Sequence, residues 1–124
     1  MTVNPFRGEI EIEIAGRKAK LRRSFACLLE IEDGLGLGLV PLSARFMARS
    51  FGLREVAVIV QAGLRAAGEN PPAFADLGEK ILQTGLMKFS APLSDFLLGA
   101  LTGGEEPDPG EAPAAGSTSS TTAA

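Results

Sequence analysis

Residues 8–33 read GEIEIEIAGRKAKLRRSFACLLEIED, and this stretch decides the fold. Its first part alternates glutamate with isoleucine over residues 9–14. Because successive side chains of a strand point to opposite faces, the three isoleucines share one face and the three glutamates share the other. The alternation therefore predicts a half-buried β-strand.

A second strand with the opposite charge follows at residues 17–22. Lys18, Lys20 and Arg22 share one face, and Ala19 and Leu21 share the other. With a two-residue loop at Ala15-Gly16, all cross-strand pairs match, and opposite-charge pairs contribute about 0.2–1 kcal/mol each. The predicted pairs are Glu9 with Arg22, Ile10 with Leu21, Glu11 with Lys20, Ile12 with Ala19, Glu13 with Lys18 and Ile14 with Arg17. A four-residue loop keeps the same parity and is the alternative, since Ala-Gly is a weaker turn signal than Asn-Gly.

Helices are expected after the hairpin, because an isolated hairpin is marginally stable and its apolar face needs a cover. Ser24 is a candidate N-cap and Gly34 a candidate C-terminal stop for the first helix. Pro41 suits the first position of a helix, and Ser90 is a candidate cap before Pro92. The predicted elements are a hairpin at 8–23 and helices at about 25–34, 41–51, 53–67, 72–84 and 86–101, the last being either one kinked helix or two short ones.

These elements predict an α+β fold with one domain over residues 1–102. An N-terminal two-stranded antiparallel β-hairpin packs on a bundle of four to five short α-helices. Beyond it the composition changes to Gly, Glu, Pro, Ala, Ser and Thr. Such a segment has little apolar surface to bury against the entropy cost of ordering, so residues 103–124 are predicted to form a disordered tail.

The chain lacks the side chains that most enzymes and metal sites use. It has no His and a single Cys, Cys27, which excludes a disulfide within the chain and removes the commonest general base. Cys27 lies in an apolar helical pattern and is interpreted as a core thiol. The carboxylates at 30, 32 and 33 are interpreted as a solvated helix face. We therefore expect no catalysis, no cofactor, no metal and no small-molecule substrate.

Charge and hydropathy argue against two further classes of partner, membranes and nucleic acids. No segment approaches the roughly 18 apolar residues of a membrane span, and the N-terminus has no apolar run of signal-peptide length, so a cytoplasmic location is predicted. Residues 1–102 carry 12 basic and 11 acidic side chains. This balance gives no general attraction to nucleic acid. The helices at 42–50 and 53–67 are spaced like a helix-turn-helix, but the second is apolar and is expected to pack in the core.

The order of short motifs resembles a known family. Residues 4–9 read NPFRGE and precede the first strand, the second strand holds Leu21-Arg22, and residues 25–32 read FACLLEIE before Ala62-Gly63-Leu64-Arg65 closes a later helix. In this order, over about residues 4–100, they resemble the small tail protein of gene transfer agents, a family similar to the phage tail assembly chaperones. The sequence departs from the expected Asp-Gly type of turn at Ala15.

The resemblance implies a non-enzymatic assembly factor whose partners are the tape-measure protein and other tail proteins. Members of such families are thought to coat the tape-measure protein until tail tube subunits polymerise around it. A chaperone of this kind needs an apolar receiving surface. The candidate residues are Leu86, Met87, Phe89, Phe96 and Leu97. The alternative interpretation is that these side chains complete the core.

Two other functions and self-association remain open at this point. One alternative is a structural tail tube or connector subunit, which purified particles would contain in stoichiometric amount. The other is a small nucleic-acid-binding regulator, whose retention on DNA would fall steeply with salt. A two-stranded ribbon also has two open edges, which predicts a homo-oligomer.

Overall fold

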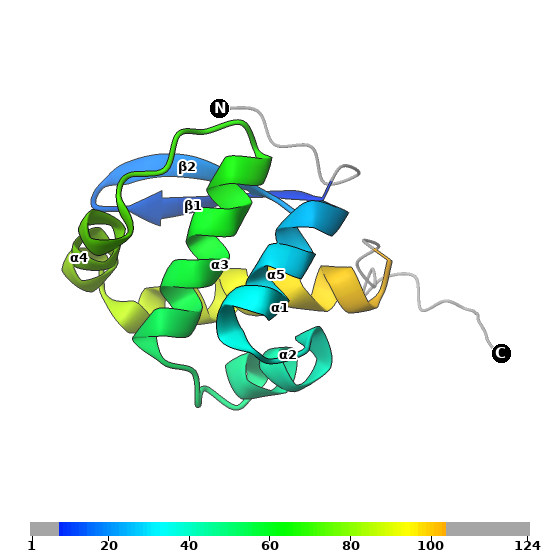
Figure 1. Cartoon of the computed structure of the whole chain (residues 1–124). Coiled ribbons are helices and arrows are strands. Elements are labelled where there is room, and N and C mark those ends of the chain that lie inside the picture. The colour runs from blue at the N-terminus through cyan, green and yellow to red at the C-terminus, as the bar shows by residue number, and fades with distance from the viewer. Residues whose placement is uncertain (1–7, 104–124) are drawn as a thin grey trace, which may run out of the picture.

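The computed structural model of the chain describes residues 8–103. The β-hairpin is at the N-terminal end of this range. Two antiparallel strands precede five α-helices and one 3₁₀ helix in this part of the chain, which confirms the predicted α+β fold (Figure 1). From residue 104 on, the predicted tail lies outside the described residues. The elements are β1 (Glu9–Ile14), β2 (Arg17–Arg22), α1 (Phe25–Leu35), α2 (Leu39–Met47), α3 (Leu53–Ala66), α4 (Phe74–Thr84), η2 (Leu86–Phe89) and α5 (Ser90–Leu101).

The hairpin has the predicted register. All six pairs are formed, from Glu9 opposite Arg22 to Ile14 opposite Arg17. Ala15 and Gly16 have φ angles of 52° and 81°, as a two-residue type I′ turn requires, so the two-residue loop is confirmed. The backbone N–H of Ala15 donates to Thr84 Oγ1 at 2.6 Å, which ties the turn to the end of α4.

The charged face of the hairpin is not uniformly solvated. Glu11 and Glu13 are exposed, but Glu9 is only 6% exposed, so the prediction of three glutamates on a solvent face is wrong at Glu9. Its Oε2 lies 3.9 Å from Lys20 Nζ, a diagonal neighbour rather than the residue directly opposite. A nearby ammonium group offsets part of the cost of burying this carboxylate.

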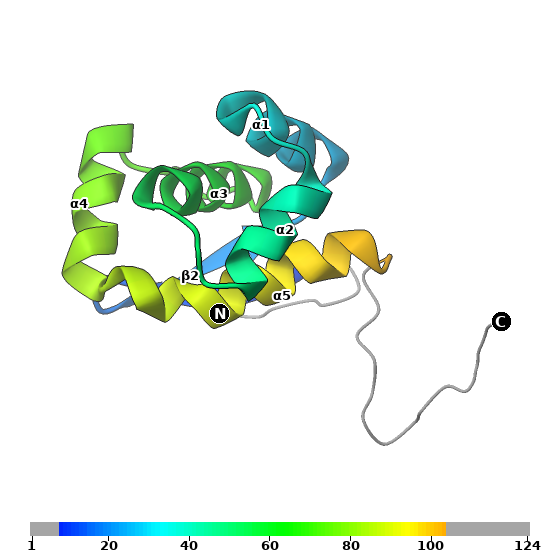
Figure 2. The ribbon, with the colours of Figure 1, turned by 90° about the horizontal axis from the view of Figure 1, so that it is seen from below.

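Helix α3 is the centre of the core. Eight of its residues are buried, and it packs against α1, α4 and β2. A Cβ added at Gly63 would lie 2.9 Å from Leu21 Cβ, so glycine allows the helix to approach the strand closely. Figure 2 shows α5 and α1 on opposite sides of the bundle, with α2 and α3 between them. The predicted role of 53–67 as a core helix is confirmed.

The ends of the first two helices differ partly from the sequence prediction. Ser24 caps α1 as predicted, because its Oγ accepts from Cys27 N at 3.1 Å. The stop predicted at Gly34 is wrong, since the helix ends after Leu35 with Gly36 at φ 63°. Helix α2 begins two residues before Pro41. The first-turn N–H groups of a helix have no partner within it, so a proline there loses no hydrogen bond.

The segment predicted at 86–101 forms two helical pieces, η2 and α5. Ser90 is the first residue of α5 and makes no side-chain cap, so the prediction that it caps this helix is wrong. Gly85 has φ 110° and separates α4 from η2. Pro92 falls in the first turn of α5, where its missing N–H is again without cost.

Candidate interaction surfaces

The structure separates the five side chains that the sequence offered as a binding surface. Phe89, Phe96 and Leu97 belong to the hydrophobic core and are at most 1% exposed. Leu86 is half-buried against that core, and Met87 is 56% exposed. The alternative interpretation, that these side chains complete the core, therefore describes three of them. Met87 alone of the five presents a largely exposed side chain.

Met87 lines a groove that the sequence did not reveal. The groove lies between the end of α2 and the junction of η2 with α5, and its volume is about 670 Å³. Met47 is 65% exposed on the α2 side of this groove. We call it the methionine groove, and it is lined by Phe46, Met47, Arg49, Met87, Lys88, Ser90, Ala91 and Ser94.

A tight turn after α2 positions the wall of the methionine groove. Arg49 has φ 58°, and its N–H donates to Phe46 O at 3.1 Å, while Ser50 N donates to Arg45 O at 2.8 Å. The Phe51 ring stacks on that of Phe46, with centroids 4.5 Å apart and an interplanar angle of 1°. Phe46 is buried and stacked on Phe51, so it fixes the end of α2 that lines the groove.

The chemistry of the methionine groove is apolar and cationic. Arg49 and Lys88 are both exposed, and none of the residues that line the groove is acidic. Methionine is flexible and polarisable, so it adapts to partners of different shape and makes favourable sulfur–aromatic contacts. Such a groove suits a segment that carries an aromatic or aliphatic side chain next to a carboxylate.

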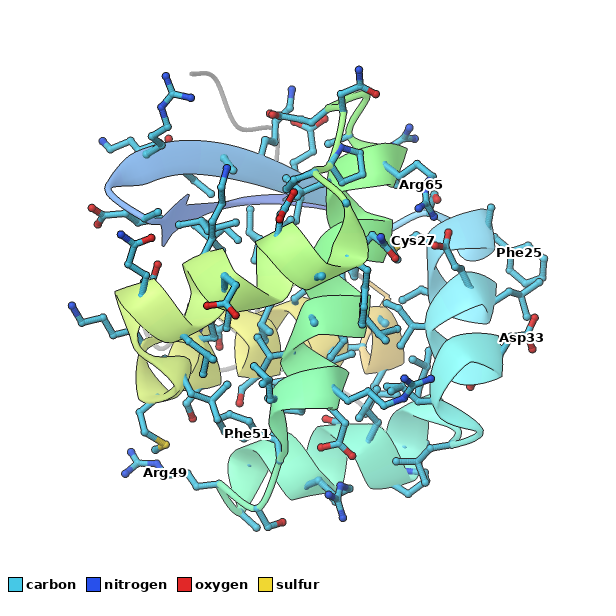
Figure 3. The ribbon with its side chains drawn as sticks, turned by 60° about the vertical axis from the view of Figure 1, so that its left-hand side comes forward. Phe25, Cys27, Asp33, Arg49, Phe51 and Arg65 are labelled. Carbon is cyan, nitrogen blue, oxygen red and sulfur yellow. The ribbon has the colours of Figure 1, made fainter. Side chains whose placement is uncertain are left out.

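A second exposed apolar surface lies on α1. Phe25 is 79% exposed and Leu29 is also exposed, while Cys27 and Ile31 of the same helix are buried. Phe25, Leu29 and Asp33 follow one another at intervals of four residues and share one side of the helix. We call these three residues the α1 outer face. In Figure 3, Phe25 and Asp33 lie on one side of the molecule and Arg49 lies on the opposite side.

Most acids near the α1 outer face have structural roles, which corrects the interpretation of residues 30, 32 and 33 as a solvated face. Glu32 Oε2 accepts from the N–H of Leu39 at 2.8 Å and so caps α2. Glu30 forms an ion pair with Arg65 of α3. Asp33 is exposed, and its carboxylate makes no hydrogen bond or ion pair with the residues that the structure describes. Its carboxylate is available to a partner.

The thiol and the potential metal ligands of residues 8–103 can be placed in the structure. Burial raises the pKa of the Cys27 thiol from 9.0 to about 11, which keeps it protonated and unreactive near neutral pH. This part of the chain holds no cluster of three potential metal ligands among His, Cys, Asp and Glu. No helix within it has the length and apolar character to cross a bilayer.

A further hollow, of about 480 Å³, lies beside the hairpin turn and is partly polar. Its lining includes Glu13, Gln83, Thr84 and Lys88. The Thr84 hydroxyl is already engaged, since it accepts from Ala15 N and donates to Lys80 O at 2.8 Å. The Thr84 hydroxyl is therefore not free to bind a ligand in this hollow.

Comparison with known proteins assigns the described fold to a family. A family model described as "Phage tail tube protein, GTA-gp10" matches residues 7–103. The match covers the hairpin and every helix of the structure. Comparison with curated proteins and with solved structures gave no match.

Proposed function

Because the chain belongs to the GTA-gp10 family of phage tail tube proteins, we propose that it is a structural subunit of the tail of a phage or gene transfer agent particle. The observation that carries the proposal is the family match, which spans the hairpin and all the helices. The match also confirms the resemblance to gene transfer agent tail proteins found in the sequence, while the similarity to tail assembly chaperones stays a prediction. Other tail proteins are accordingly its expected partners.

The family description favours one of the alternatives raised by the sequence over the leading hypothesis. A tail tube protein stays in the finished particle, whereas a chaperone of the tape-measure protein leaves it. The structural alternative, a tube or connector subunit, is therefore the better supported function. Binding to the tape-measure protein remains a prediction, and so does a cytoplasmic site of assembly.

Two exposed apolar surfaces support a role in assembly. Phe25 and Leu29 are exposed on α1, and Met47 and Met87 are exposed at the methionine groove. Both surfaces rest on elements that pack firmly on the core through Ile31 and Phe46. A subunit of a larger structure must present apolar side chains to its neighbours, and exposed apolar patches commonly mark such contacts.

The nucleic-acid alternative receives no support from α3, the helix that would have to read the bases. Eight of its residues are buried, including Val56, Ile59 and Val60. Its two arginines serve the fold: Arg54 donates to Gly34 O at 2.9 Å, and Arg65 pairs with Glu30. The family is likewise a structural one rather than an enzyme family.

The amount of the chain in purified particles tests the proposal. Particles are purified from cells that carry this gene, and the chain is quantified by mass spectrometry against the major tail protein. A structural subunit is expected in a fixed ratio to that protein, with tailless or short-tailed particles when the gene is deleted. Absence of the chain from intact particles would refute the structural role and favour the chaperone hypothesis.

Co-expression with the tape-measure protein provides the matching test of that second hypothesis. If the tape-measure protein becomes soluble only when this chain is present, the chain acts as a chaperone. A structural subunit is expected to leave the solubility of the tape-measure protein unchanged.

A further inference from the structure

We propose that copies of the chain associate head to tail, with the α1 outer face of one copy docked in the methionine groove of the next. The inference rests on the proposed function, because a structural tail subunit is a repeated subunit. It names the partner as a second copy of this chain and names the two surfaces that meet. The argument depends on side-chain chemistry, on charge and on the relative positions of the two surfaces.

The apolar groups of the two surfaces are complementary. Phe25, at 79%, has the highest exposed fraction among the large apolar side chains of the described residues. The methionine groove offers two exposed thioethers, on Met47 and Met87, and the buried Phe46 also lines it. An aromatic ring beside methionine sulfur makes favourable contacts, and the flexible methionine side chains can close around it. A helix laid in an apolar groove is a recurrent mode of protein recognition.

The charges are complementary as well. Arg49 and Lys88 line the methionine groove, and no acid lines it. Asp33 lies two helical turns from Phe25, about 12 Å along α1, and has no partner among the described residues. Docking of α1 in the groove places an acidic group near two cations. Contact between two methionine grooves, or between two α1 outer faces, would bring like charges together, which disfavours both symmetric arrangements.

The positions of the two surfaces determine the kind of assembly. Phe25 and Asp33 lie on one side of the molecule and Arg49 lies on the other (Figure 3). Helix α1 also lies on the opposite side of the bundle from α5, whose first residues line the methionine groove (Figure 2). One copy can therefore use both surfaces at once, with two different neighbours. A head-to-tail contact of this kind generates a ring if the rotation closes and a filament if it does not.

Sedimentation velocity of the full chain at increasing concentration tests the contact. The wild-type chain is expected to form species larger than a dimer. Phe25→Asp and Met87→Asp are each expected to weaken association about tenfold or more, because each places a carboxylate in the apolar contact. Leu82→Asp is the matched control: Leu82 is 53% exposed on α4, close to the 56% of Met87, and belongs to neither surface. Far-UV circular dichroism verifies that all three variants are folded.

Mixing the two variants isolates the head-to-tail geometry. Phe25→Asp retains an intact methionine groove, and Met87→Asp retains an intact α1 outer face. Each is expected to be monomeric alone, while an equimolar mixture is expected to form a heterodimer and nothing larger. A wild-type chain that stays monomeric, a mixture that stays monomeric, or an equal loss of association in Leu82→Asp would each overturn the proposal.

The outcomes separate this inference from the proposed function. If particles contain the chain in a fixed ratio and the Phe25→Asp variant builds tails normally, the contact is wrong and the structural role stands. If the wild-type chain self-associates as described but is absent from particles, the contact stands and the structural role is wrong.

Discussion

The close approach of α3 to the hairpin can be tested at Gly63. A Cβ at this position would lie 2.9 Å from Leu21 Cβ, 3.2 Å from its Cδ2 and 3.3 Å from its Cγ. Leu21 is fully buried and paired with Ile10 across the hairpin, so it has little room to move away. Gly63→Ala must therefore shift α3 or β2.

Two opposing effects set the size of the change. Overpacking a well-filled core by one methyl group costs about 1–3 kcal/mol. Alanine in place of glycine within a helix contributes about 1 kcal/mol in the other direction. We expect Gly63→Ala to lower the free energy of unfolding by up to about 2 kcal/mol, and therefore to lower the midpoint of thermal unfolding by up to about 8–16 °C in a domain of this size.

Gly78 of α4 is the matched control, because a Cβ there would meet no atom within 4 Å. Gly78→Ala is expected to raise the free energy of unfolding by about 0.5–1 kcal/mol, from helix propensity alone. The chain has no Trp and no Tyr, so unfolding in urea is followed by far-UV circular dichroism. If Gly63→Ala proves as stable as Gly78→Ala, the close packing of α3 on β2 is refuted.

Three further substitutions test the turn, a helix cap and the buried thiol. Ala15 has φ 52°, and a left-handed backbone costs about 1–2 kcal/mol for a residue with a Cβ. Ala15→Asn should therefore stabilise the chain, and Ala15→Val should destabilise it. Equal unfolding midpoints of the two variants in urea would contradict the type I′ turn. Glu32→Ala removes the cap on α2 and should lower the free energy of unfolding by about 1 kcal/mol, whereas Glu79→Ala, at an exposed site on α4, should change it by less than about 0.5 kcal/mol. In the folded chain the pKa of the Cys27 thiol is raised from 9.0 to about 11. The thiol of the unfolded chain therefore ionises at lower pH than that of the folded chain, and the free energy of unfolding should fall as pH rises from about 9 to 11. Cys27→Ala should make that fall shallower when the unfolding midpoints are compared across this pH range, and an unchanged slope would show that the thiol is not buried.

The hairpin was predictable because its information is local. Residues 9–22 carry charge and hydropathy patterns that agree in one register, and a slip by one residue would expose the isoleucines. Parity alone left a four-residue loop open, and the structure decides for the two-residue turn although Ala15 is an unfavourable residue for it. The exception is Glu9, whose burial depends on packing that the alternating pattern does not contain.

The binding surfaces were not predictable from the pattern, because α5 is apolar on more than one side. Phe96 and Leu97 lie in the core, while Leu98 and Leu101 of the same helix are exposed. Spacing alone cannot decide which side of such a helix faces the core. The methionine groove depends on the contact between α2 and α5, which are some 45 residues apart in the sequence. A signal for the α1 outer face was present in Phe25 and Leu29, which are four residues apart, as Cys27 and Ile31 are, but lie two positions earlier and therefore on a different side of the helix.

Some charged side chains join elements of the fold, and others remain available at the surface. Long-range polar contacts join the ends of separate helices, as when Glu32 caps α2 and when Arg45 Nε lies 2.7 Å from Glu55 Oε2 at the start of α3. Arg23 likewise donates to Phe96 O at 3.1 Å, which fastens the end of the hairpin to α5. Asp33, Arg49 and Lys88 take part in no such contact among residues 8–103 and lie beside exposed apolar groups. Because the side chains of these three residues hold no element of the fold in place, their replacement should change association with little effect on stability.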